Sequence, residues 1–182
     1  MSRIVAVEYV TLDGVFEEPA WSGPFFGEEL QAFQFANLME ADALLLGRVT
    51  YEGFSDAWPR MEAETGEFGV KMNSMPKWVA TSTPADLRWN ARALEGDVVA
   101  AVTALKADEA TGSLLVNGSA DLFNSLSGAG LIDEYRLMVF PVVQGAGKRL
   151  WADAATPRAL ELVKSDVTAT GVAILTYRPA SA

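Results

Sequence analysis

Two turns in the sequence place a glycine beside residues that bind anions well. Gly47 and Arg48 follow the apolar run "ALLL", and Thr50 comes two residues later. Glycine lets a ligand approach the backbone closely, the guanidinium supplies a fixed charge, and a threonine at a helix N-terminus can bond to a phosphate. In "VNGSADL", Gly118 precedes Ser119, a good helix N-cap, so N–H groups and the helix dipole favour an anion there. Taken alone, either turn is explained equally well as an ordinary strand-to-helix connection.

Two more turns follow the strands expected at 3–10 and 77–82. Asp13-Gly14 forms a short turn, and Thr81 to Thr83 offer three hydroxyl groups. Both kinds of turn are common, and Asp13 is explained equally well as a plain turn residue. In open α/β sheets, however, ligands bind at the carboxyl ends of the strands. Several such turns in one sheet therefore predict a site for a ligand of the nucleotide kind.

The residues that are missing restrict the chemistry further. The 182-residue chain has no Cys and no His, which excludes thiol catalysis, a Ser-His-Asp triad and the usual zinc site. We expect no metal site. The 14 Lys and Arg against 24 Asp and Glu give a net charge of −10, which disfavours binding to nucleic acid or to an anionic membrane surface. A chain so poor in reactive side chains is expected to borrow its chemistry from a cofactor, or to perform none.

Hydrophobic periodicity predicts an α/β fold. Helical patterns lie between most of the early strands, which favours a mostly parallel sheet with helices on both faces. The last two strands form a predicted hairpin that turns near Thr170 and Gly171. We therefore expect a single three-layer α/β domain over residues 1–182, with a mostly parallel mixed sheet that ends in an antiparallel hairpin. Strands are expected at 3–10, 42–47, 77–82, 97–101, 113–117, 133–143, 158–168 and 171–178.

Two observations concern the N-terminal region. Residues 11–27 are expected to form a long loop, and such loops are often functional. This loop carries Trp21, Phe25 and Phe26, which are costly to leave in solvent. The chain enters a strand pattern at once without a signal-peptide cleavage region, and its longest apolar runs are too short to span a membrane. We therefore expect a cytoplasmic protein.

Five segments together resemble a known family. "VTLDG", "LLLGRVTYEGF", "VNGSADL", "LIDEYRLMVFPVV" and "QGAGKRLW", in this order and spacing, are similar to the dihydrofolate-reductase-like superfamily. More closely, they resemble stand-alone proteins similar to the reductase domain of the bifunctional riboflavin-biosynthesis deaminase/reductase. The resemblance covers roughly residues 3–178. We expect no deaminase activity from these residues, because that chemistry needs a zinc site and the sequence has no His and no Cys.

The resemblance implies that NADPH binds across the turns described above. Gly47 would lie against the cofactor, Arg48 near its 2′-phosphate and Thr50 on its pyrophosphate, while Ala6 would border the nicotinamide. The Asp13-Gly14 loop would close over that ring. The cofactor residues implied by the resemblance are Ala6, Gly47, Arg48, Thr50, Thr81, Ser82, Asn117, Gly118, Ser119, Ala120, Asp121 and Leu122.

The resemblance also implies an NADPH-dependent reductase that passes hydride to a small heteroaromatic or sugar-derived substrate. Asp13 is the candidate for handling a proton or a hydrogen bond. The long apolar strands are compatible with a homodimer. The alternative from another class is a nucleotide-binding or sensing protein that keeps the pocket without turnover, and a weaker one is a purely structural oligomer. The substrate pocket is expected to be lined by Trp21, Phe25, Tyr51, Phe54, Trp58, Phe140 and Pro141.

Two departures from the family pattern concern the substrate. Val15 stands where the riboflavin reductases carry a basic residue suited to a phosphorylated ribose. Dihydrofolate reductase has a carboxylate on its first helix for the pterin ring, and none of Glu28, Glu29 and Glu40 is clearly at that place. Cofactor use therefore transfers better than substrate identity, and we expect poor turnover of the phosphoribosylated pyrimidine of riboflavin synthesis.

Overall fold

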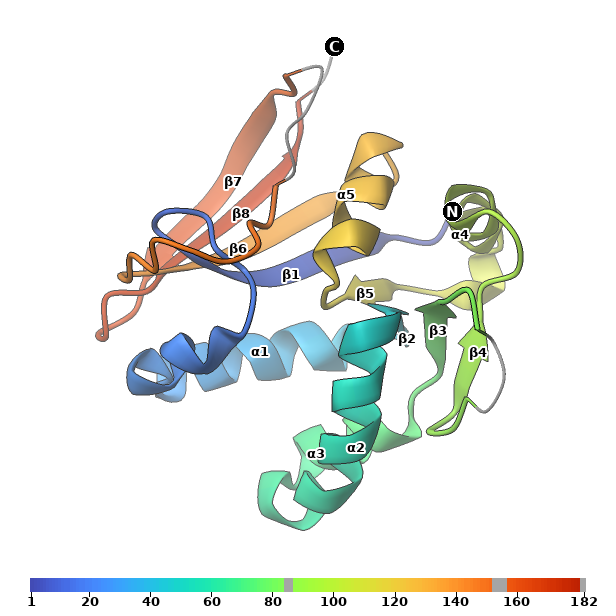
Figure 1. The fold of residues 1–182 in the computed structure, drawn as a ribbon, viewed down its shortest axis with the longest axis horizontal. Helices are drawn as coiled ribbons and strands as arrows, with labels where there is room; N and C mark the ends of the chain where they lie inside the picture. Colours follow the sequence, from blue (N-terminus) through green and yellow to red (C-terminus); the bar gives the residue numbers. More distant parts are fainter. Residues whose placement is uncertain (84–86, 152–156, 181–182) are drawn as a thin grey trace.

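The computed structural model describes residues 1–83, 87–151 and 157–180. Its centre is an eight-stranded sheet in the order β4-β3-β2-β5-β1-β6-β8-β7 (Figure 1). Neighbouring strands from β4 to β6 are parallel, whereas β8 lies antiparallel between β6 and β7. The predicted mixed sheet with an antiparallel C-terminal hairpin is confirmed. The strands are β1 (Ile4–Thr11), β2 (Ala43–Gly47), β3 (Lys77–Ala80), β4 (Ala91–Ala93), β5 (Leu114–Val116), β6 (Glu134–Phe140), β7 (Leu160–Val167) and β8 (Ala173–Pro179).

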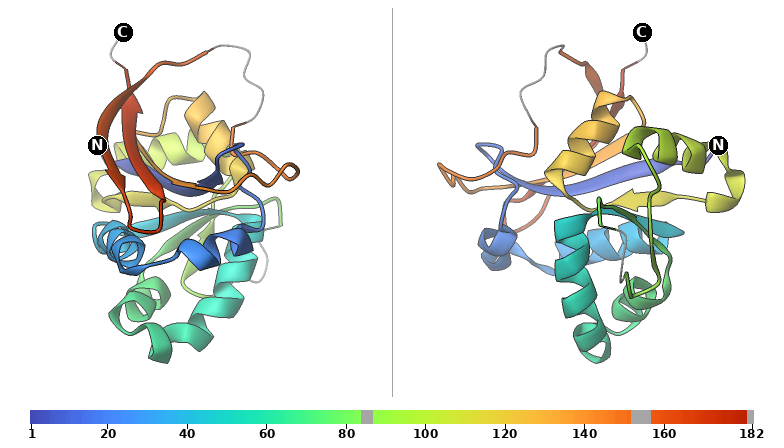
Figure 2. Two further views of the ribbon diagram at one scale, coloured as in Figure 1. Left: turned by 90° about the vertical axis from the view of Figure 1, so that its left-hand side faces the viewer. Right: turned by 45° about the vertical axis from the view of Figure 1, so that its right-hand side comes forward.

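Helices cover both faces of the sheet, which confirms the three-layer arrangement (Figures 1 and 2). The helices α1, α2 and α3 lie on one side, and α4 and α5 lie on the other. Each face has its own apolar cluster, one around Leu44 and Leu46 and the other around Leu45 and Phe123. The helices are α1 (Glu28–Met39), α2 (Arg48–Thr65), α3 (Glu67–Ser74), α4 (Val98–Ala107) and α5 (Ala120–Gly128), with 3-10 helices η1 (Pro19–Phe25) and η2 (Glu109–Thr111).

Strand β2 is buried at every residue because it lies between β3 and β5 and is covered on both faces. A continuous apolar run is typical of such a central parallel strand. In the sheet register, Gly47 pairs with Ala80, and Leu45 pairs with Val116. The turns that follow β2, β3 and β5 therefore meet at one edge of the sheet.

The strand expected at 97–101 is wrong, because these residues begin helix α4. Asp97 caps this helix, and its side chain accepts a hydrogen bond from the Ala100 N–H at 2.9 Å. A short apolar run does not distinguish a buried strand from a buried helix, and the alanines between the valines favour the helix. The edge strand β4, just before it, was not predicted.

The segment 11–27 contains η1 and is fastened to the loop that precedes Leu150. Val15 forms an isolated antiparallel bridge with Arg149, and the Phe16 N–H donates to the Lys148 carbonyl at 2.9 Å. The C-terminal hairpin turns as predicted, since the Gly171 N–H donates to the Thr168 carbonyl at 2.9 Å. Within the described residues, no helix is both long enough and apolar enough to cross a membrane.

Candidate functional site

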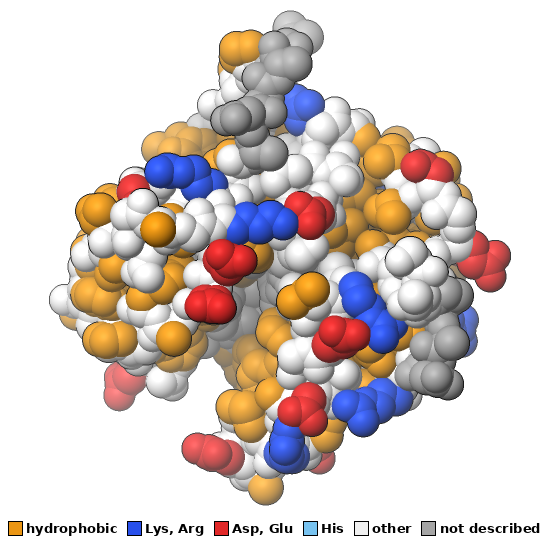
Figure 3. All heavy atoms as spheres, viewed as in Figure 1, with side chains coloured by type: hydrophobic (Ala, Val, Ile, Leu, Met, Phe, Trp, Pro, Cys, Tyr) orange, Lys and Arg blue, Asp and Glu red, His pale blue; other side chains and the backbone are white. Residues whose placement is uncertain are grey.

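A cavity of about 1590 Å³ opens at the edge of the sheet where β2, β3 and β5 end. It extends from the N-terminus of α2 along this helix to α3, with α1 as its opposite wall. The space-filling view shows a hollow between the α1 side and the α2 side of the molecule (Figure 3). At the sheet edge its lining is rich in glycine and hydroxyl groups, and between the helices it is largely aromatic. The aromatic lining residues are Tyr9, Phe16, Phe26, Phe35, Phe54, Trp58 and Phe68.

The two glycine turns touch each other at the edge of the sheet. The Gly47 N–H donates to the Gly118 carbonyl at 3.3 Å. A β-carbon on Gly118 would lie 2.9 Å from the Thr50 hydroxyl oxygen and 3.0 Å from the Phe16 ring, and Gly118 has φ +66°. A side chain at position 118 is therefore excluded both by the available space and by the backbone conformation.

The N-termini of α2 and α5 both face the cavity. Helix α2 has no side-chain cap, and its first residues, Arg48 to Thr50, line the cavity. In α5, Ser119 caps by accepting from the Leu122 N–H at 3.4 Å, as predicted, and Ala120 and Asp121 line the cavity. The first N–H groups of a helix have no acceptor within it. Two helix dipoles and two sets of such N–H groups thus meet where a phosphate group could bind.

Arg48 spans the turns after β2 and β3. Its Nε donates to Glu52 at 2.6 Å, and one terminal nitrogen donates to the Thr83 carbonyl at 3.1 Å. The Thr83 N–H in turn donates to the Thr81 hydroxyl at 3.1 Å. The guanidinium is therefore held at the cavity wall by Glu52 of α2 and by the backbone of Thr83, which follows β3.

Nearly all the residues predicted to bind the cofactor are brought together in this cavity. Ala6 is the exception, because it is fully buried in the core on the α5 side of the sheet. The predicted residues that line the cavity are Gly47, Arg48, Thr50, Thr81, Ser82, Asn117, Gly118, Ser119, Ala120, Asp121 and Leu122.

The residues predicted to line the substrate pocket divide into two groups. Phe54 and Trp58 line the cavity and contact each other edge to face, with ring centroids 6.2 Å apart. Trp21 and Phe25 instead pack edge-on against the buried Phe140, at 5.3 and 6.3 Å between centroids. They form a cluster behind the wall and are absent from the lining.

Tyr51 and Pro141 also lie outside the lining. Tyr51 is buried, and its hydroxyl group accepts from the Arg88 N–H at 2.8 Å and donates to the Arg88 carbonyl at 3.1 Å. Pro141 is exposed beside Gly171 in the C-terminal hairpin turn. Tyr51 thus fastens the chain before β4 to α2, and neither residue reaches the cavity surface.

Asp13 serves a neighbouring loop. Its carboxylate accepts from the Thr11 hydroxyl at 2.6 Å and from the N–H groups of Gln144 and Gly145 at 3.1 and 2.8 Å. These hydrogen bonds, the one from Thr11 first, lower the pKa of Asp13 to about 2. The carboxylate is ionised at neutral pH and is absent from the cavity lining. Asp13 therefore holds the loop at Gln144 and Gly145 in place and has no proton to donate.

Val15 is fully buried and packs toward Gly147, outside the cavity lining. The side chain at position 15 therefore does not face the cavity, and its lack of charge does not decide whether a phosphorylated substrate binds there. Of the three carboxylates considered for the first helix, Glu28, Glu29 and the C-cap residue Glu40, only Glu28 lines the cavity. Glu29 accepts from the Ala169 N–H, and Glu40 pairs with Arg136. The cavity also contains Lys148, whose Nζ lies 2.8 Å from Asp121.

Two ionisable residues of β1 in the lining were missed by the sequence analysis. Glu8 is 3% exposed, and its carboxyl accepts from the Gly118 N–H at 2.9 Å. Burial raises the pKa of Glu8 to about 8, although the hydrogen bond from Gly118 lowers it. Burial likewise raises the pKa of Tyr9 to about 12, against a hydrogen bond from Gln34. The available signal was a carboxylate inside the otherwise apolar strand "IVAVEYV".

Comparison with known proteins places this chain in a family. The model of the family described as "RibD C-terminal domain" matches residues 3–174. The chain belongs to this family. An uncharacterized protein of Bacillus subtilis (strain 168), YyaP, is 27% identical over 181 residues, which cover 96% of this chain and 94% of that protein.

Solved structures share the fold. A protein from Shewanella sp. PV-4 assigned to riboflavin biosynthesis superposes with a TM-score of 0.76 at 21% identity, over 100% of both chains. Dihydrofolate reductase from Enterococcus faecalis, solved with NADP(H), superposes with a TM-score of 0.66 at 16% identity, over 98% of this chain and 97% of that one. The RibD-type chain described here thus has a reductase-like fold, and the predicted resemblance is confirmed. Among the described residues, no group of three or more acidic, His or Cys side chains could hold a metal ion.

Proposed function

We propose that this protein is an NADPH-dependent reductase of a small heteroaromatic or sugar-derived substrate. The observation that carries the proposal is the meeting of two helix N-termini, α2 and α5, at one side of a large cavity with aromatic walls. N–H groups, hydroxyl groups and one guanidinium are the donors that a pyrophosphate and a 2′-phosphate require. Membership of the RibD C-terminal domain family and the fold shared with dihydrofolate reductase support the same ligand.

The residues of the sheet edge would bind and orient the cofactor. The first turn of α5 and Thr50 would hold the pyrophosphate, and Arg48 would pair with the 2′-phosphate. When bound, NADPH supplies the hydride. The chain itself would supply orientation and the exclusion of water, which are the usual protein contributions to cofactor chemistry.

The aromatic part of the cavity would take the substrate. Tyr9 and Phe35 lie on the β1 and α1 side, while Phe54, Trp58 and Phe68 come from α2 and α3. Flat apolar walls with few polar groups suit a ring-shaped ligand. We therefore propose a small heteroaromatic or sugar-derived substrate, converted in the cytoplasm by one reductase domain that includes the whole chain.

Titration with NADPH, followed by cofactor fluorescence and calorimetry, tests the proposal. We expect one saturable site per chain with a dissociation constant in the micromolar range, roughly 1 μM to 1 mM. A panel of pteridines, pyrimidines and quinones then tests turnover by the loss of NADPH absorbance. Absence of saturable binding would refute the proposal as a whole. Binding without oxidation by any acceptor would leave a nucleotide-binding protein and discard the reductase.

A further inference from the structure

Glu8 is a buried carboxyl group in the lining of the cavity and takes no part in the cofactor and substrate contacts proposed for the other lining residues. It lies on the central strand β1 and is 3% exposed. One oxygen, Oε1, accepts from the Gly118 N–H at 2.9 Å, within the turn that leads into α5. Among the described residues, the carboxyl group of Glu8 takes part in no other hydrogen bond. Every described side-chain oxygen that is shielded from solvent does have a hydrogen-bond partner. The second oxygen, Oε2, is therefore open to the cavity.

The described charged groups near this cavity form no ion pair with Glu8. Arg48 on α2 pairs with Glu52, and Lys148 pairs with Asp121 on α5. Glu17, on the segment after β1, lines the cavity as an exposed carboxylate, and its Oε2 accepts from the Lys148 N–H. Opposite Glu8 in the sheet, β6 presents Leu137. In the described part of the chain, no cation thus contacts Glu8.

We propose that Glu8 is a positioning residue for the cofactor, an inference that rests on NADPH as the ligand of this cavity. As a neutral acid it holds Gly118 by accepting its N–H, and it presents the hydroxyl group of Oε2 as a donor to the dinucleotide. As a carboxylate it keeps the bond to Gly118, but it loses the donor and places a negative charge beside the turn that receives the pyrophosphate. The carboxylate and the pyrophosphate would then repel each other, and this repulsion is stronger where water is excluded.

The protonation state of Glu8 supports this assignment. Burial without a cationic partner raises the pKa of Glu8 to about 8, against the lowering effect of the Gly118 hydrogen bond. The acid is therefore mostly neutral at pH 7. If the dinucleotide binds only the neutral form, Glu8 adds no pH dependence to its affinity well below pH 8, and above pH 8 the affinity falls about tenfold for each pH unit, because binding is then linked to proton uptake.

The first test measures NADPH affinity from pH 7 to pH 10 for the wild type, for Glu8→Gln and for the control Glu161→Gln. Glutamine mimics the neutral acid, since its amide can accept from Gly118 and donate to the ligand at every pH. We expect Glu8→Gln to bind as the wild type does at pH 7 and to lose the decline above pH 8. Glu161 is exposed on β7, and its variant should keep the wild-type profile. A decline that persists in Glu8→Gln overturns the assignment.

The second test needs no variant, so it holds even if Glu8→Gln does not fold. Calorimetric titration of the wild type with NADPH, in two buffers that differ in ionisation enthalpy, counts the protons taken up. At pH 8.5 we expect uptake of about three quarters of a proton per NADPH, and at pH 7.5, where the 2′-phosphate is still almost fully ionised, about one quarter. Binding without uptake at pH 8.5 refutes the role of Glu8 and leaves the cofactor site standing. Absence of NADPH binding at every pH refutes the proposed function instead.

Discussion

Gly47 and Ser119 lie so close together that position 47 has no room for a side chain. A β-carbon on Gly47 would lie 2.8 Å from the Ser119 Cβ and 3.0 Å from its backbone nitrogen. Gly47 has φ −74°, a conformation that any residue can adopt. Glycine is therefore required at position 47 only because of the close contact with Ser119. The contact joins the end of β2 to the cap of α5, and with it the two halves of the proposed pyrophosphate site.

Gly47→Ala should therefore separate the two turns. Overpacking of a close contact costs about 1–3 kcal/mol, and the shift should weaken NADPH binding along with stability. Thermal unfolding and an NADPH titration measure both effects. Gly23→Ala is the matched control, because no atom lies within 4 Å of a β-carbon there. A Gly47→Ala protein with wild-type stability and affinity would show that the contact relaxes without consequence.

The sequence predicted the site best where its signals are local. A glycine followed by a cation, or by a capping serine, is visible within a few residues, and both turns line the cavity. Asp13 looked equally local, but its partners Gln144 and Gly145 lie more than a hundred residues away. Those partners come from a loop that the sequence pattern does not place.

The same limit explains why Glu8 was missed, and why Trp21 and Phe25 were expected in the pocket. The role of a side chain on β1 depends on what lies across the sheet, and the partner of Glu8 is Gly118. Aromatic residues in a long loop can face a cavity or pack behind its wall, and here Phe140 decides the outcome. The order of the strands sets such contacts, and periodicity alone does not supply it.

Arg48→Ala should change the choice between NADPH and NADH. A charge-assisted hydrogen bond from a guanidinium to the 2′-phosphate contributes about 1.5–3 kcal/mol, which is roughly 10- to 150-fold in affinity. NADPH binding should weaken by this factor and NADH binding should stay nearly unchanged. Dissociation constants for both cofactors, measured in the same buffer, test this. Equal losses for the two would assign Arg48 to the pyrophosphate or to the fold.

Glu52→Gln is the companion variant. Glu52 holds the Arg48 Nε at 2.6 Å, so its carboxylate competes with a phosphate for the same guanidinium. Removing the charge of Glu52 should strengthen NADPH binding modestly and leave the dissociation constant of NADH unchanged. Weaker NADPH binding in Glu52→Gln would mean that Glu52 orients Arg48 rather than competing for it.

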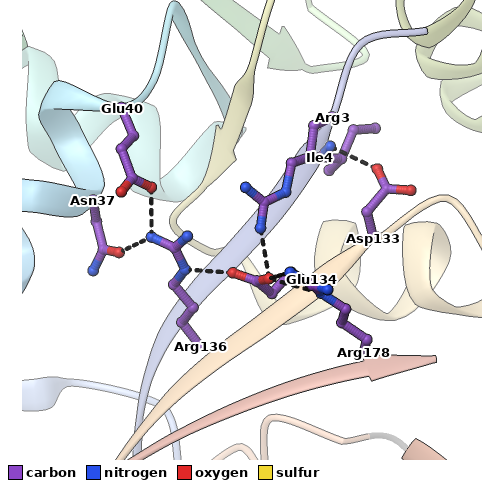
Figure 4. A network of polar contacts seen from close by, with 8 residues as sticks. All are labelled: Arg3, Ile4, Asn37, Glu40, Asp133, Glu134, Arg136 and Arg178. Carbon is purple, nitrogen blue, oxygen red and sulfur yellow. Dashed lines mark hydrogen bonds and ion pairs between the residues drawn. The ribbon is translucent and has the colours of Figure 1, made fainter. Parts of the chain in front are cut away.

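Glu134 should stabilise the fold in a pH-dependent way. Its side chain is 4% exposed and pairs with three arginines from three segments, Arg3, Arg136 and Arg178 (Figure 4). Burial acts to raise the pKa of Glu134, but Arg136, Arg178 and Arg3 outweigh it, and the net pKa is lowered. A lowered pKa in the folded state means stability that is present above the pKa of the unfolded carboxyl and is lost as pH falls through the folded value.

Glu134→Gln should therefore cost about 3 kcal/mol near neutral pH, the low end for breaking a buried ion pair because two of the arginines are partly exposed. The cost should shrink in acid, where the wild type also loses the charge. Denaturant unfolding at pH 7 and pH 3 measures it. The control Glu109→Gln removes only an exposed pair with the N-terminus and should cost well under 1 kcal/mol. An equal cost at both pH values would contradict the electrostatic account.

A phosphorylated pyrimidine should be a poor substrate, for a reason that lies in the cavity rather than at Val15. Within the described residues, the cations of the lining are Arg48 and Lys148, and both already pair with a carboxylate. The same lining carries four further carboxylates, besides the mostly neutral acid Glu8. These are Glu17, Glu18, Glu28 and Glu64.

With Arg48 assigned to the 2′-phosphate of NADPH and Lys148 paired with Asp121, a substrate phosphate would thus find no free cationic partner among the described residues of the lining. The test compares kcat/KM for the phosphorylated pyrimidine and for its dephosphorylated form. We expect the dephosphorylated form to be preferred, and Glu28→Lys, which reverses a charge on the α1 wall, to narrow that preference. Glu67→Lys makes the same charge change at an exposed position outside the lining and should leave the ratio unchanged. If the wild type instead favours the phosphorylated form by about tenfold, equivalent to about 1.4 kcal/mol of transition-state binding, the cavity must present a cation to that phosphate and the argument from its charges fails.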